Sequence, residues 1–391
     1  MPESERSTAK ADALVRAIHA GPLALVLAAT GGGSLALSRL LTVPGASRSV
    51  LEGIVPYEPE ALIDWLGAVP EQFCSERTAR AMALVAYRRA RRLTAKHQPA
   101  PAVAGLGITA SLASDRPKRG PHRVHLAWQT RETTCTRSVE LEKGKRSRAD
   151  EERLVADLAL DLIAAGEGIA ERPDLDLSPS EKPVERRYDA PPAWQALLAG
   201  ESQLAPASGM AAADRPGAVF PGAFHPLHAG HQRIAEITAT RLEQPVAFEI
   251  SIDNVDKLPL DYLEMADRAR QFGDDRPLWF TRAATFVEKS ELFPGAWFVV
   301  GVDTIARIAD PRYYGAQPDI CGQALKAIAE RGCRFLVFGR EWEGRFCTLA
   351  DLRLPPGLAA ICEGLSDTDF RLDIRSRDLR RTTQADDALG D

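Results

Sequence analysis

Two histidines three positions apart mark the stretch of this 391-residue sequence with the clearest chemical meaning, His228 and His231. The apolar residues 217–220 predict a short buried strand, residues 221–227 a turn-rich loop, and residues 228–242 a helix. A helix that begins where a strand ends presents free N–H groups and a positive dipole end, which favour a bound phosphate. The two imidazoles would then lie where negative charge builds up on a transferring phosphoryl group.

The same stretch resembles the H-x-G-H signature of the nucleotidyltransferase superfamily. The matching residues are Phe224-His-Pro-Leu-His-Ala-Gly-His231, in a strand-loop-helix context. The resemblance implies that His228 and His231 are catalytic. It also implies a nucleotide-binding role for Gly222, Phe224 and Gly230, since glycines let the backbone approach a ligand closely. Taken alone, each histidine would more often be a capping or packing residue, so the prediction rests on the combination.

A second motif of that superfamily, I-S-x-T-x-x-R, resembles Ile374-Arg-Ser-Arg-Asp-Leu-Arg380, with matches at Ile374, Ser376 and Arg380. The resemblance implies that Ser376 caps a helix. It makes Arg380 a third catalytic residue, because a guanidinium fork fits the oxygens of the β- and γ-phosphates in pairs. Arg375 and Arg377 depart from the pattern. Arg377 is counted among the nucleotide-binding candidates, and a solvated basic face is the alternative for both arginines.

Two further segments, Asn254-Val-Asp-Lys-Leu-Pro-Leu260 and Val300-Gly-Val-Asp303, resemble nicotinamide mononucleotide adenylyltransferases. Each follows a predicted strand. The resemblance spans residues 217–381 and implies that Asp303 contacts the nucleotide and that Lys257 offers charge to a phosphate. For Asp303, a helix N-cap is the alternative.

The reaction that these resemblances imply needs few catalytic groups. A mononucleotide phosphate is a dianion near neutral pH and can attack the α-phosphorus of ATP without a general base. The protein must supply in-line positioning and positive charge, here from His228, His231 and Arg380, with Mg²⁺ entering as part of the bound ATP. The predicted partners are therefore ATP and a mononucleotide substrate.

The N-terminal half resembles the CinA C-terminal family, whose active members deamidate nicotinamide mononucleotide. The matching segments, in order, are Thr30-Gly-Gly-Gly33, Leu41-Thr-Val-Pro-Gly-Ala-Ser47, Gly53-Ile-Val-Pro-Tyr57 and Cys74-Ser-Glu76, within residues 12–130. In that family a serine nucleophile is assisted by a tyrosine and a lysine, and the corresponding residues here are Ala28, Tyr57 and Leu62. Alanine and leucine supply neither a nucleophile nor a proton acceptor, so we expect no deamidation.

A retained ligand site is nevertheless predicted in this half. The Gly31–Ser34 loop precedes a helix and could cradle a phosphate through backbone amides. Residues 116–125 concentrate basic side chains, with a solvated loop as the alternative. The pair His122 and His125 is a weak metal hypothesis because no Cys or further His lies near it in the sequence, and no metal site is predicted. The candidate ligand residues are Thr30, Gly31, Gly32, Tyr57, Lys118 and Arg119.

Alternating strands and helices must position these residues, which predicts an α/β fold in both halves. The predicted N-terminal strands are 23–28, 103–108 and 124–128, and the helices are 75–93 and 148–165. The predicted C-terminal strands are 219–220, 246–252, 278–281, 297–300, 335–338 and 370–374. The second half is expected to be a Rossmann-like, doubly wound parallel sheet with its ligand beyond the carboxyl ends of the strands.

The chain length predicts two domains. The expected boundaries are a CinA-like domain over 11–166, a partly ordered linker over 167–216 and a nucleotidyltransferase domain over 217–385. Within the linker, Trp194 to Leu198 has helical spacing and an aromatic side chain that should dock on a domain. The apolar run from Leu23 to Leu41 is interrupted by glycines and an arginine, so it reads as strand, loop and helix, not as a membrane span.

Composition narrows the class of protein. A net charge of -5 without a basic stripe argues against a nucleic-acid partner. The polar N-terminus lacks the pattern of a secretory signal, and six widely spaced cysteines without a C-x-x-C pair favour reduced thiols, so a cytoplasmic protein with no membrane partner is expected. Whether the chain forms a homo-oligomer stays open.

The sequence therefore predicts a nucleotidyltransferase that joins AMP from ATP to nicotinamide or nicotinate mononucleotide and releases pyrophosphate. One alternative is the same chemistry with another phosphate acceptor, such as phosphopantetheine, a sugar phosphate or a choline-type alcohol phosphate. A second alternative is a sensor in which both domains bind nucleotides and neither turns them over.

Overall fold

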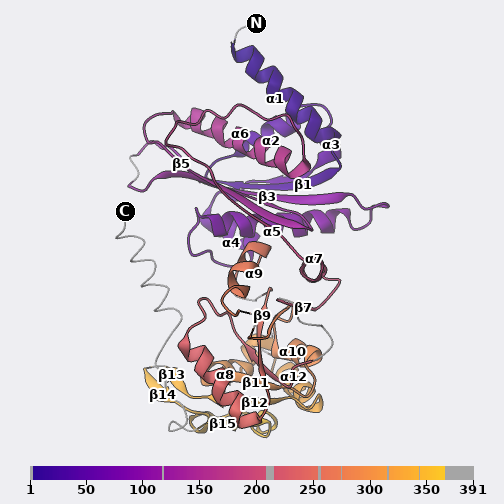
Figure 1. Ribbon diagram of the computed structural model, residues 1–391, viewed down its shortest axis with the longest axis vertical. Helices are drawn as coiled ribbons and strands as arrows, with labels where there is room; N and C mark the ends of the chain where they lie inside the picture. The colour runs from indigo at the N-terminus through magenta and orange to yellow at the C-terminus, as the bar shows by residue number, and fades with distance from the viewer. Residues whose placement is uncertain are drawn as a thin grey trace. The chain divides into compact units, whose positions relative to one another are not determined.

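The computed structural model describes residues 3–116, 119–207, 215–253, 257–273, 275–314, 317–342 and 344–365. The chain divides into two compact units (Figure 1). Unit 1 comprises Met1–Gln195 with Asn254–Glu264, and unit 2 comprises Ala196–Asp253 with Met265–Asp391. None of the helices in the described part is long and apolar enough to cross a membrane.

Unit 1 is built on a six-stranded mixed sheet in the order β2-β1-β3-β4-β5-β6. The strands are β1 (Leu23–Thr30), β2 (Val50–Ile54), β3 (Ala102–Ser111), β4 (His122–Gln129), β5 (Thr133–Leu141) and β6 (Val184–Asp189). The pairs β2-β1 and β1-β3 are parallel, whereas β3 to β6 form an antiparallel meander. The predicted strands of this half are confirmed as β1, β3 and β4.

Helices cover both faces of this sheet. They are α1 (Glu3–Ala20), α2 (Ser34–Thr42), α3 (Ala46–Ser49), α4 (Pro59–Leu66), α5 (Glu76–Thr94) and α6 (Arg148–Glu167). Figure 1 shows α2 and α6 on one side of the sheet and α4 and α5 on the other. Alternate residues of β1 divide accordingly: Leu25 and Leu27 join the core with α1, α2 and α6, while Val26 and Ala28 join clusters with α4 and α5.

Unit 1 extends beyond the predicted domain 11–166, into the predicted linker. Strand β6 pairs antiparallel with β5, and it is followed by α7 (Pro192–Ala199). Trp194 in α7 is 1% exposed and stacks on Tyr188 at 5.5 Å between ring centroids, which confirms that this aromatic residue docks. The charged, half-exposed sequence of β6 gives little hydrophobic signal, which is why the sequence pattern did not reveal it.

Unit 2 is built on a seven-stranded sheet in the order β15-β12-β11-β8-β9-β10-β7. The strands are β7 (Leu204–Pro206), β8 (Ala218–Pro221), β9 (Val246–Ser251), β10 (Leu278–Thr281), β11 (Trp297–Gly301), β12 (Arg334–Phe338) and β15 (Cys362–Gly364). All neighbours are parallel except the edge strand β7. The Rossmann-like parallel sheet is therefore confirmed, and the predicted strand 370–374 lies outside the described residues.

Helices connect these strands as a doubly wound fold requires. They are α8 (Ala229–Leu242), α9 (Tyr262–Ala269), α10 (Phe286–Leu292), α11 (Val302–Ile308), α12 (Pro318–Glu330) and α13 (Pro356–Ala359), with 3-10 turns η1 (Pro311–Tyr314) and η2 (Leu349–Asp351). A two-stranded hairpin, β13 (Arg340–Trp342) and β14 (Arg345–Cys347), lies between β12 and β15 in the chain. The unit boundary falls inside α9, since Glu264 is the last residue of unit 1 there.

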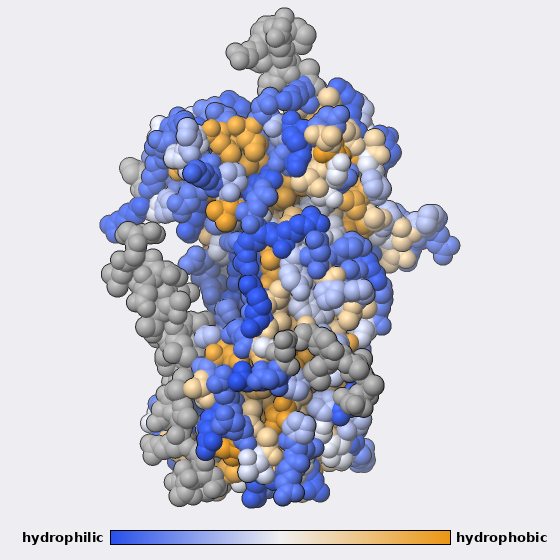
Figure 2. Space-filling model, viewed as in Figure 1, coloured by the Kyte–Doolittle hydropathy of each residue, from blue (hydrophilic) through white to orange (hydrophobic). Residues whose placement is uncertain are grey.

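The molecular surface is mostly hydrophilic on the face shown in Figure 2, and apolar side chains appear there in small separate patches. Such scattered exposure is ordinary for a folded chain. The six cysteines are all free thiols, which agrees with the prediction of reduced cysteines.

Candidate functional site

The strand order of unit 2 contains a topological switch point. Numbered along the chain, β8, β9, β10, β11, β12 and β15 are arranged in the order 3-2-1-4-5-6 of doubly wound dinucleotide-binding folds. The chain leaves the central pair β8 and β11 in opposite directions, and in doubly wound folds the ligand binds beyond the carboxyl ends of such a pair. The predicted nucleotide-binding segments both leave from this point: the histidine loop follows β8, and Asp303 follows β11.

A cluster of aromatic side chains packs against the histidine loop. Phe224 is 2% exposed, and its ring packs edge-on against Phe220 at 5.3 Å, Phe248 at 5.2 Å and Phe272 at 5.5 Å. The ring of His231 lies 4.9 Å from that of Phe224. A ring that is buried in this way has no face left for a nucleotide, so Phe224 belongs to the core and positions His231 instead.

Polar side chains from the end of α9 brace the same loop. Arg268 Nη1 donates to the carbonyl oxygen of Ala223 at 2.5 Å. Gln271 Oε1 accepts from the N–H of Leu227 at 2.8 Å, and its Nε2 donates to the oxygen of Phe224 at 3.4 Å. The backbone that leads into His228 is therefore held by specific hydrogen bonds and not by packing alone.

The two histidines form a stacked pair at the N-terminus of α8. His228 is the N-cap, and its ring lies 3.7 Å from that of His231 with an interplanar angle of 26°. The backbone N–H of His228 donates to Nδ1 of the His231 ring at 3.3 Å. An accepting Nδ1 carries no proton, so the neutral His231 ring has its N–H at Nε2 and can donate it to an anion.

Electrostatics keep this pair neutral in the unliganded protein. Burial, the His228 ring and the Arg340 guanidinium lower the pKa of His231 to about 3. Burial and the charge of Arg340 also lower the pKa of His228. At neutral pH each ring is therefore a neutral hydrogen-bond donor, and a bound polyanion would favour protonation of either ring.

Arg340 is a site residue that sequence reasoning missed. It begins the β13 hairpin, and its Nη1 donates to both carboxylate oxygens of Asp303 at 3.1 Å. A Cβ at Gly301 would meet Asp303 Oδ1 at 2.7 Å and Arg340 Cδ at 3.2 Å, so glycine leaves room for this pair at the end of β11. The position of Arg340, two residues after a predicted strand of a parallel sheet, was the signal that could have identified it.

Asp303 does not cap its helix. The N-cap of α11 is Gly301, and the Asp303 carboxylate instead binds Arg340 and lies 3.6 Å from Arg307 Nη2. The N-cap interpretation of Asp303 was therefore wrong, because two arginines compete successfully for the carboxylate. The structure thus brings Asp303 together with Arg340, and the charge of Arg340 also lowers the pKa of both histidines.

The remaining predicted residues of this half lie in different places. Gly222 follows β8, and its N–H donates to the oxygen of Glu249 at 2.9 Å, while Gly230 is buried in the first turn of α8. Lys257 is exposed and lies in the segment that belongs to unit 1. The predicted residues Ser376, Arg377 and Arg380 are outside the described residues.

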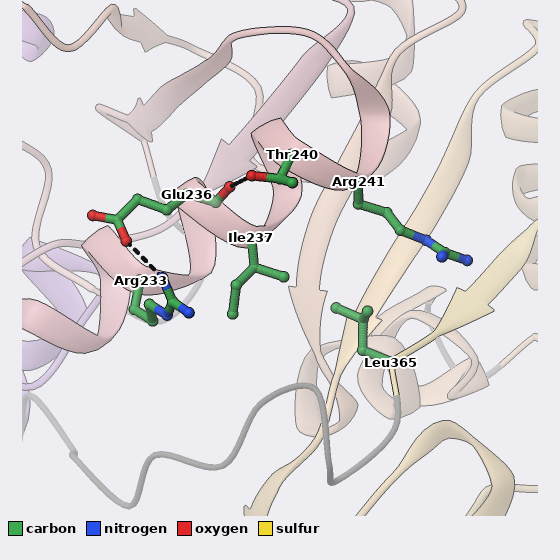
Figure 3. A pocket seen from close by; sticks show the side chains of 6 residues that line it. All are labelled: Arg233, Glu236, Ile237, Thr240, Arg241 and Leu365. Carbon is green, nitrogen blue, oxygen red and sulfur yellow. Dashed lines mark hydrogen bonds and ion pairs between the residues drawn. The ribbon is translucent and has the colours of Figure 1, made fainter.

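A surface hollow of about 290 Å³ lies on α8, and neither histidine lines it (Figure 3). Its lining residues are Arg233, Glu236, Ile237, Thr240, Arg241 and Leu365. The spacing of Arg233, Glu236, Ile237, Thr240 and Arg241 along α8 places these five residues on the face of the helix opposite His231. Arg233 pairs with Glu236 at 3.1 Å and Arg241 with Glu363, so the hollow offers no uncompensated charge for a phosphate.

The glycine loop of unit 1 already holds an anion from the same chain. Gly33, the N-cap of α2, has a φ of 94°, and its N–H donates to both oxygens of the Glu152 carboxylate at 3.0 Å. The N–H of Leu35 and the hydroxyl of Ser34 donate to Glu152 Oε1 at 3.0 and 3.1 Å. The amides that were assigned to a phosphate are therefore occupied by a carboxylate from α6. Thr30 is buried, and Gly31 and Gly32 pack closely against Ala110 and Leu112.

The positions of the missing deamidase residues are filled by apolar packing. Ala28 and Leu62 are 0% and 1% exposed and belong to one buried cluster with residues of α4 and α5. Leu258, from the segment 254–264, completes this cluster. Tyr57 is 65% exposed and stands outside it. The two positions thus meet in the fold, but with side chains that support no hydrolysis.

The described residues of the basic loop of unit 1, 116 and 119–125, do not gather into one site. Lys118 lies outside the described residues, and Arg119 is exposed. His122 is buried and contacts Glu151 Oε1 at 2.7 Å, whereas His125 contacts Ser138 at 2.8 Å. Three residues apart on β4, the two rings point to opposite faces. Among the described residues, no group of three or more His, Cys, Asp or Glu is arranged to hold a metal ion.

Comparison with known proteins finds a family similarity in the N-terminal part. The model of the CinA C-terminal domain family matches residues 8–165, which lie in unit 1 and include the glycine loop and the segments that follow it. This part of the chain is therefore similar to the CinA C-terminal domain. No curated protein matches the chain.

Solved structures of CinA-superfamily proteins are similar to the same part. The competence/damage inducible protein CihA from Agrobacterium tumefaciens is 21% identical over 40% of this chain and 94% of its own, with a TM-score of 0.32. A CinA-superfamily protein from Escherichia coli is 18% identical over 43% of this chain and 92% of its own, with a TM-score of 0.32. At these values the similarity of residues 8–165 to the CinA C-terminal domain rests on the family match alone.

Proposed function

We propose that this protein is a nucleotidyltransferase that transfers AMP from ATP to nicotinamide or nicotinate mononucleotide and releases pyrophosphate. The observation that carries the proposal is the stacked, neutral pair His228 and His231 at the first turn of α8, at the switch point of a doubly wound sheet. Amides at a helix N-terminus and imidazole N–H groups are suited to a polyphosphate.

The reaction needs no general base from the chain. A phosphate oxygen of the acceptor attacks the α-phosphorus of Mg²⁺-bound ATP, a new P–O bond forms, and the bond to the departing pyrophosphate breaks. Negative charge grows on the leaving pyrophosphate and on the α-phosphate oxygens. His231 donates from Nε2, and Arg340 supplies a fixed positive charge whose field reaches both histidines.

The choice of acceptor rests on two resemblances. The segments around Lys257 and Asp303 resemble nicotinamide mononucleotide adenylyltransferases, and the active members of the CinA family act on nicotinamide mononucleotide. Both halves of the chain thus point to a pyridine mononucleotide. The resemblance of the C-terminal motif further implies that Arg380 grips the β- and γ-phosphates of ATP and that Ser376 caps a helix start, and Arg377 stays a nucleotide-binding candidate.

The test is pyrophosphate release from the full chain with Mg²⁺-ATP and one acceptor at a time: nicotinamide mononucleotide, nicotinate mononucleotide, phosphopantetheine or none. We expect release only with a pyridine mononucleotide. Release with phosphopantetheine alone would replace the acceptor but keep the reaction class. ATP binding without release for any acceptor would overturn the enzyme proposal in favour of a nucleotide sensor.

A further inference from the structure

Asp303 holds two arginines at the carboxyl end of β11. Both oxygens of its carboxylate accept from Arg340 Nη1 at 3.1 Å, and Arg307 Nη2 lies 3.6 Å from its Oδ2. Arg307 Nε also donates to the backbone oxygen of Asp303 at 3.3 Å. Two guanidinium groups therefore share one carboxylate, and the contacts of the described residues leave one positive charge of this group without a counter-charge.

This positive charge lies where a doubly wound fold binds its ligand. Asp303 is near the start of α11, directly after β11, and β11 pairs with β8 at the switch point. The side chain of Arg307, one turn further along α11, leans back towards the start of the helix, as helical side chains do, and so reaches Asp303. Arg340 comes from the β13 hairpin, and its charge lowers the pKa of both His228 and His231.

Both arginines keep donors that can meet a ligand. The side chains of Arg340 and Arg307 are 43% and 55% exposed, whereas that of Asp303 is 23% exposed. Within the described part of the chain, no hydrogen bond uses Nε or Nη2 of Arg340, and none uses Nη1 of Arg307. A guanidinium that a carboxylate orients through some of its donors can offer the others to phosphate oxygens.

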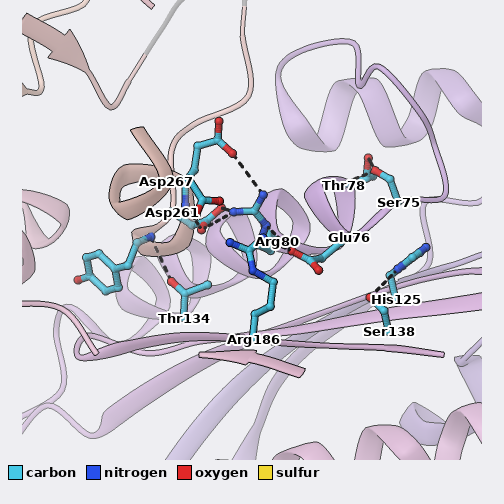
Figure 4. Close-up of polar contacts among 12 residues, drawn as sticks. Ser75, Glu76, Thr78, Arg80, His125, Thr134, Ser138, Arg186, Asp261 and Asp267 are labelled. Atoms are coloured by element: carbon cyan, nitrogen blue, oxygen red, sulfur yellow. Dashed lines mark hydrogen bonds and ion pairs between the residues drawn. The ribbon is translucent and has the colours of Figure 1, made fainter. Parts of the chain in front are cut away.

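A cluster of arginine and carboxylates in unit 1 shows the opposite balance. Arg80 is 4% exposed, and its guanidinium donates to Asp261 at 3.0 Å and to Glu264 at 3.2 Å. Its Nε lies 3.5 Å from Glu76, and Figure 4 shows Arg80 between Asp261 on one side and Glu76 on the other. One buried arginine there meets three carboxylates, which suits a structural cluster and leaves no place for an anion.

The contact between Arg307 and Asp303 would by itself indicate only a surface ion pair. The two residues are four apart on a helix, and exposed pairs of this kind contribute little to stability. The second arginine on the same carboxylate and the position at the switch point distinguish this pair from an ordinary one. Two guanidinium groups held by one carboxylate match a ligand with neighbouring anionic groups, as in a linear polyphosphate, better than a single phosphate.

We propose that Arg307 and Arg340 together bind the β- and γ-phosphates of ATP, and that Asp303 orients the two guanidinium groups and does not contact the nucleotide. This inference rests on the proposed function and names the part of ATP that the end of β11 recognises. The phosphate of the acceptor mononucleotide is the other anion with suitable chemistry. The experiment therefore separates the two sources.

The test is binding to the full chain, measured by titration calorimetry with four probes: Mg²⁺-ATP, inorganic triphosphate, AMP and nicotinamide mononucleotide. For Arg307→Gln we expect the Kd for Mg²⁺-ATP and for inorganic triphosphate to rise by about 10-fold, the range of one charge-assisted contact. The Kd for AMP and for nicotinamide mononucleotide should change by less than about 2-fold, because neither carries a β- or γ-phosphate. Arg307→Lys should recover part of the loss, because the charge returns without the guanidinium fork.

The matched control is Arg241→Gln. Arg241 is also 55% exposed and pairs with the carboxylate of Glu363. It lies in the last turn of α8, about 15 Å along the helix from His231. Its removal changes the net charge by the same amount and should leave the Kd of every probe within about 2-fold of the wild-type value, so the control separates a local contact from a general charge effect.

Unchanged Kd values for Mg²⁺-ATP and inorganic triphosphate in Arg307→Gln would overturn the inference, as would a wild type that binds neither. Weaker binding of nicotinamide mononucleotide alone would also overturn it, because the arginines would then serve the acceptor, and equal losses for AMP and ATP would place Arg307 at the α-phosphate. Binding is read without turnover. A loss of ATP affinity in a protein that releases no pyrophosphate would keep this inference and reject the proposed reaction, whereas turnover with unchanged ATP affinity in Arg307→Gln would do the reverse.

Discussion

The two units share a local pattern: a buried strand is followed by a loop with glycine and by the start of a helix. They differ in what lies at that helix start. In unit 1 the amides of Gly33 and Leu35 bind the carboxylate of Glu152, more than a hundred residues away in the sequence. In unit 2 the corresponding helix start carries His228 and His231, with Arg340 supplying positive charge. An anion-binding pattern can therefore serve an external ligand only where the rest of the fold does not provide the anion.

The positions expected to carry chemistry differ in the same way. Ala28 and Leu62 are buried among apolar side chains that include Leu258. His228 and His231 are instead partly buried and polar, with their pKa lowered by burial and by Arg340. Perturbed titrating groups at a switch point are what a functional site is expected to show, whereas a filled apolar cluster is what a structural element shows.

The largest expected effect comes from the histidine pair. His228→Ala with His231→Ala should lower kcat for pyrophosphate release by about 10³-fold or more, because loss of one preorganised donor to developing charge costs roughly 10²–10³-fold. The measurement is the rate with saturating Mg²⁺-ATP and the active acceptor. Arg233→Ala, on the opposite face of α8, is the control and should retain nearly full activity. An undiminished rate in the double variant would mean that the histidine pair is not catalytic.

A smaller effect is expected at Arg340. Arg340→Ala should lower kcat/KM for ATP by about 10–100-fold, the range of one charge-assisted contact. Arg340→Lys should recover part of this, because the charge returns without the guanidinium fork. Since Arg340 lowers the pKa of both histidines, its removal should raise the pKa of His228 and His231 towards 6.5, with burial still holding His231 below that value.

Histidine titration by NMR checks the second part of this prediction independently of turnover. Asp303→Asn is the companion variant: it removes the carboxylate that binds Arg340 and leaves the arginine charge in place. It should not reproduce the pKa increase. If Arg340→Ala left both histidine titrations unchanged, the guanidinium would not act on the pair as the structure indicates.

Much of the fold follows from hydrophobic periodicity along the chain. The strands β1, β8, β9, β10, β11 and β12 were predicted because each is a short apolar run between helical patterns. The histidine loop was found because its residues are contiguous in sequence. Strand β6, with the sequence Val184-Glu-Arg-Arg-Tyr-Asp189, was not predicted because its stability comes from pairing with β5.

The details that the sequence could not show all depend on contacts between distant residues. Phe224 looks like a ligand-binding aromatic in its motif, but its φ of 44° and the surrounding phenylalanines turn the ring into the core. Arg340 becomes part of the site only when β11 and β12 pair and bring it to Asp303. The role of Glu152 likewise requires α6 to pack beside the glycine loop.

The smallest expected effect on activity concerns Glu152, which binds the helix start of unit 1. Glu152→Ala deprives the N–H groups of Gly33 and Leu35 of their acceptor, so unit 1 should lose about 1–3 kcal/mol of stability. The emptied loop then has the amides and helix start that bind anions, so inorganic phosphate should raise the melting temperature of the variant and not that of the wild type. Pyrophosphate release should stay within about 2-fold of the wild-type rate, because the described hydrogen bonds of Glu152 join it to the glycine loop of its own unit.

The control for this variant is Glu330→Ala, which removes an exposed helical glutamate at the end of α12 and should change stability by less than about 0.5 kcal/mol. Thermal unfolding of the full chain with and without phosphate distinguishes the two cases. Stabilisation of the wild-type unit 1 by phosphate would mean that the Glu152 carboxylate yields to ligands, and the N-terminal loop would then be a regulated anion site. Stabilisation of the variant alone would show that the Glu152 carboxylate occupies the place of a bound anion. In that case the glycine loop of unit 1 stabilises the fold and does not bind a substrate.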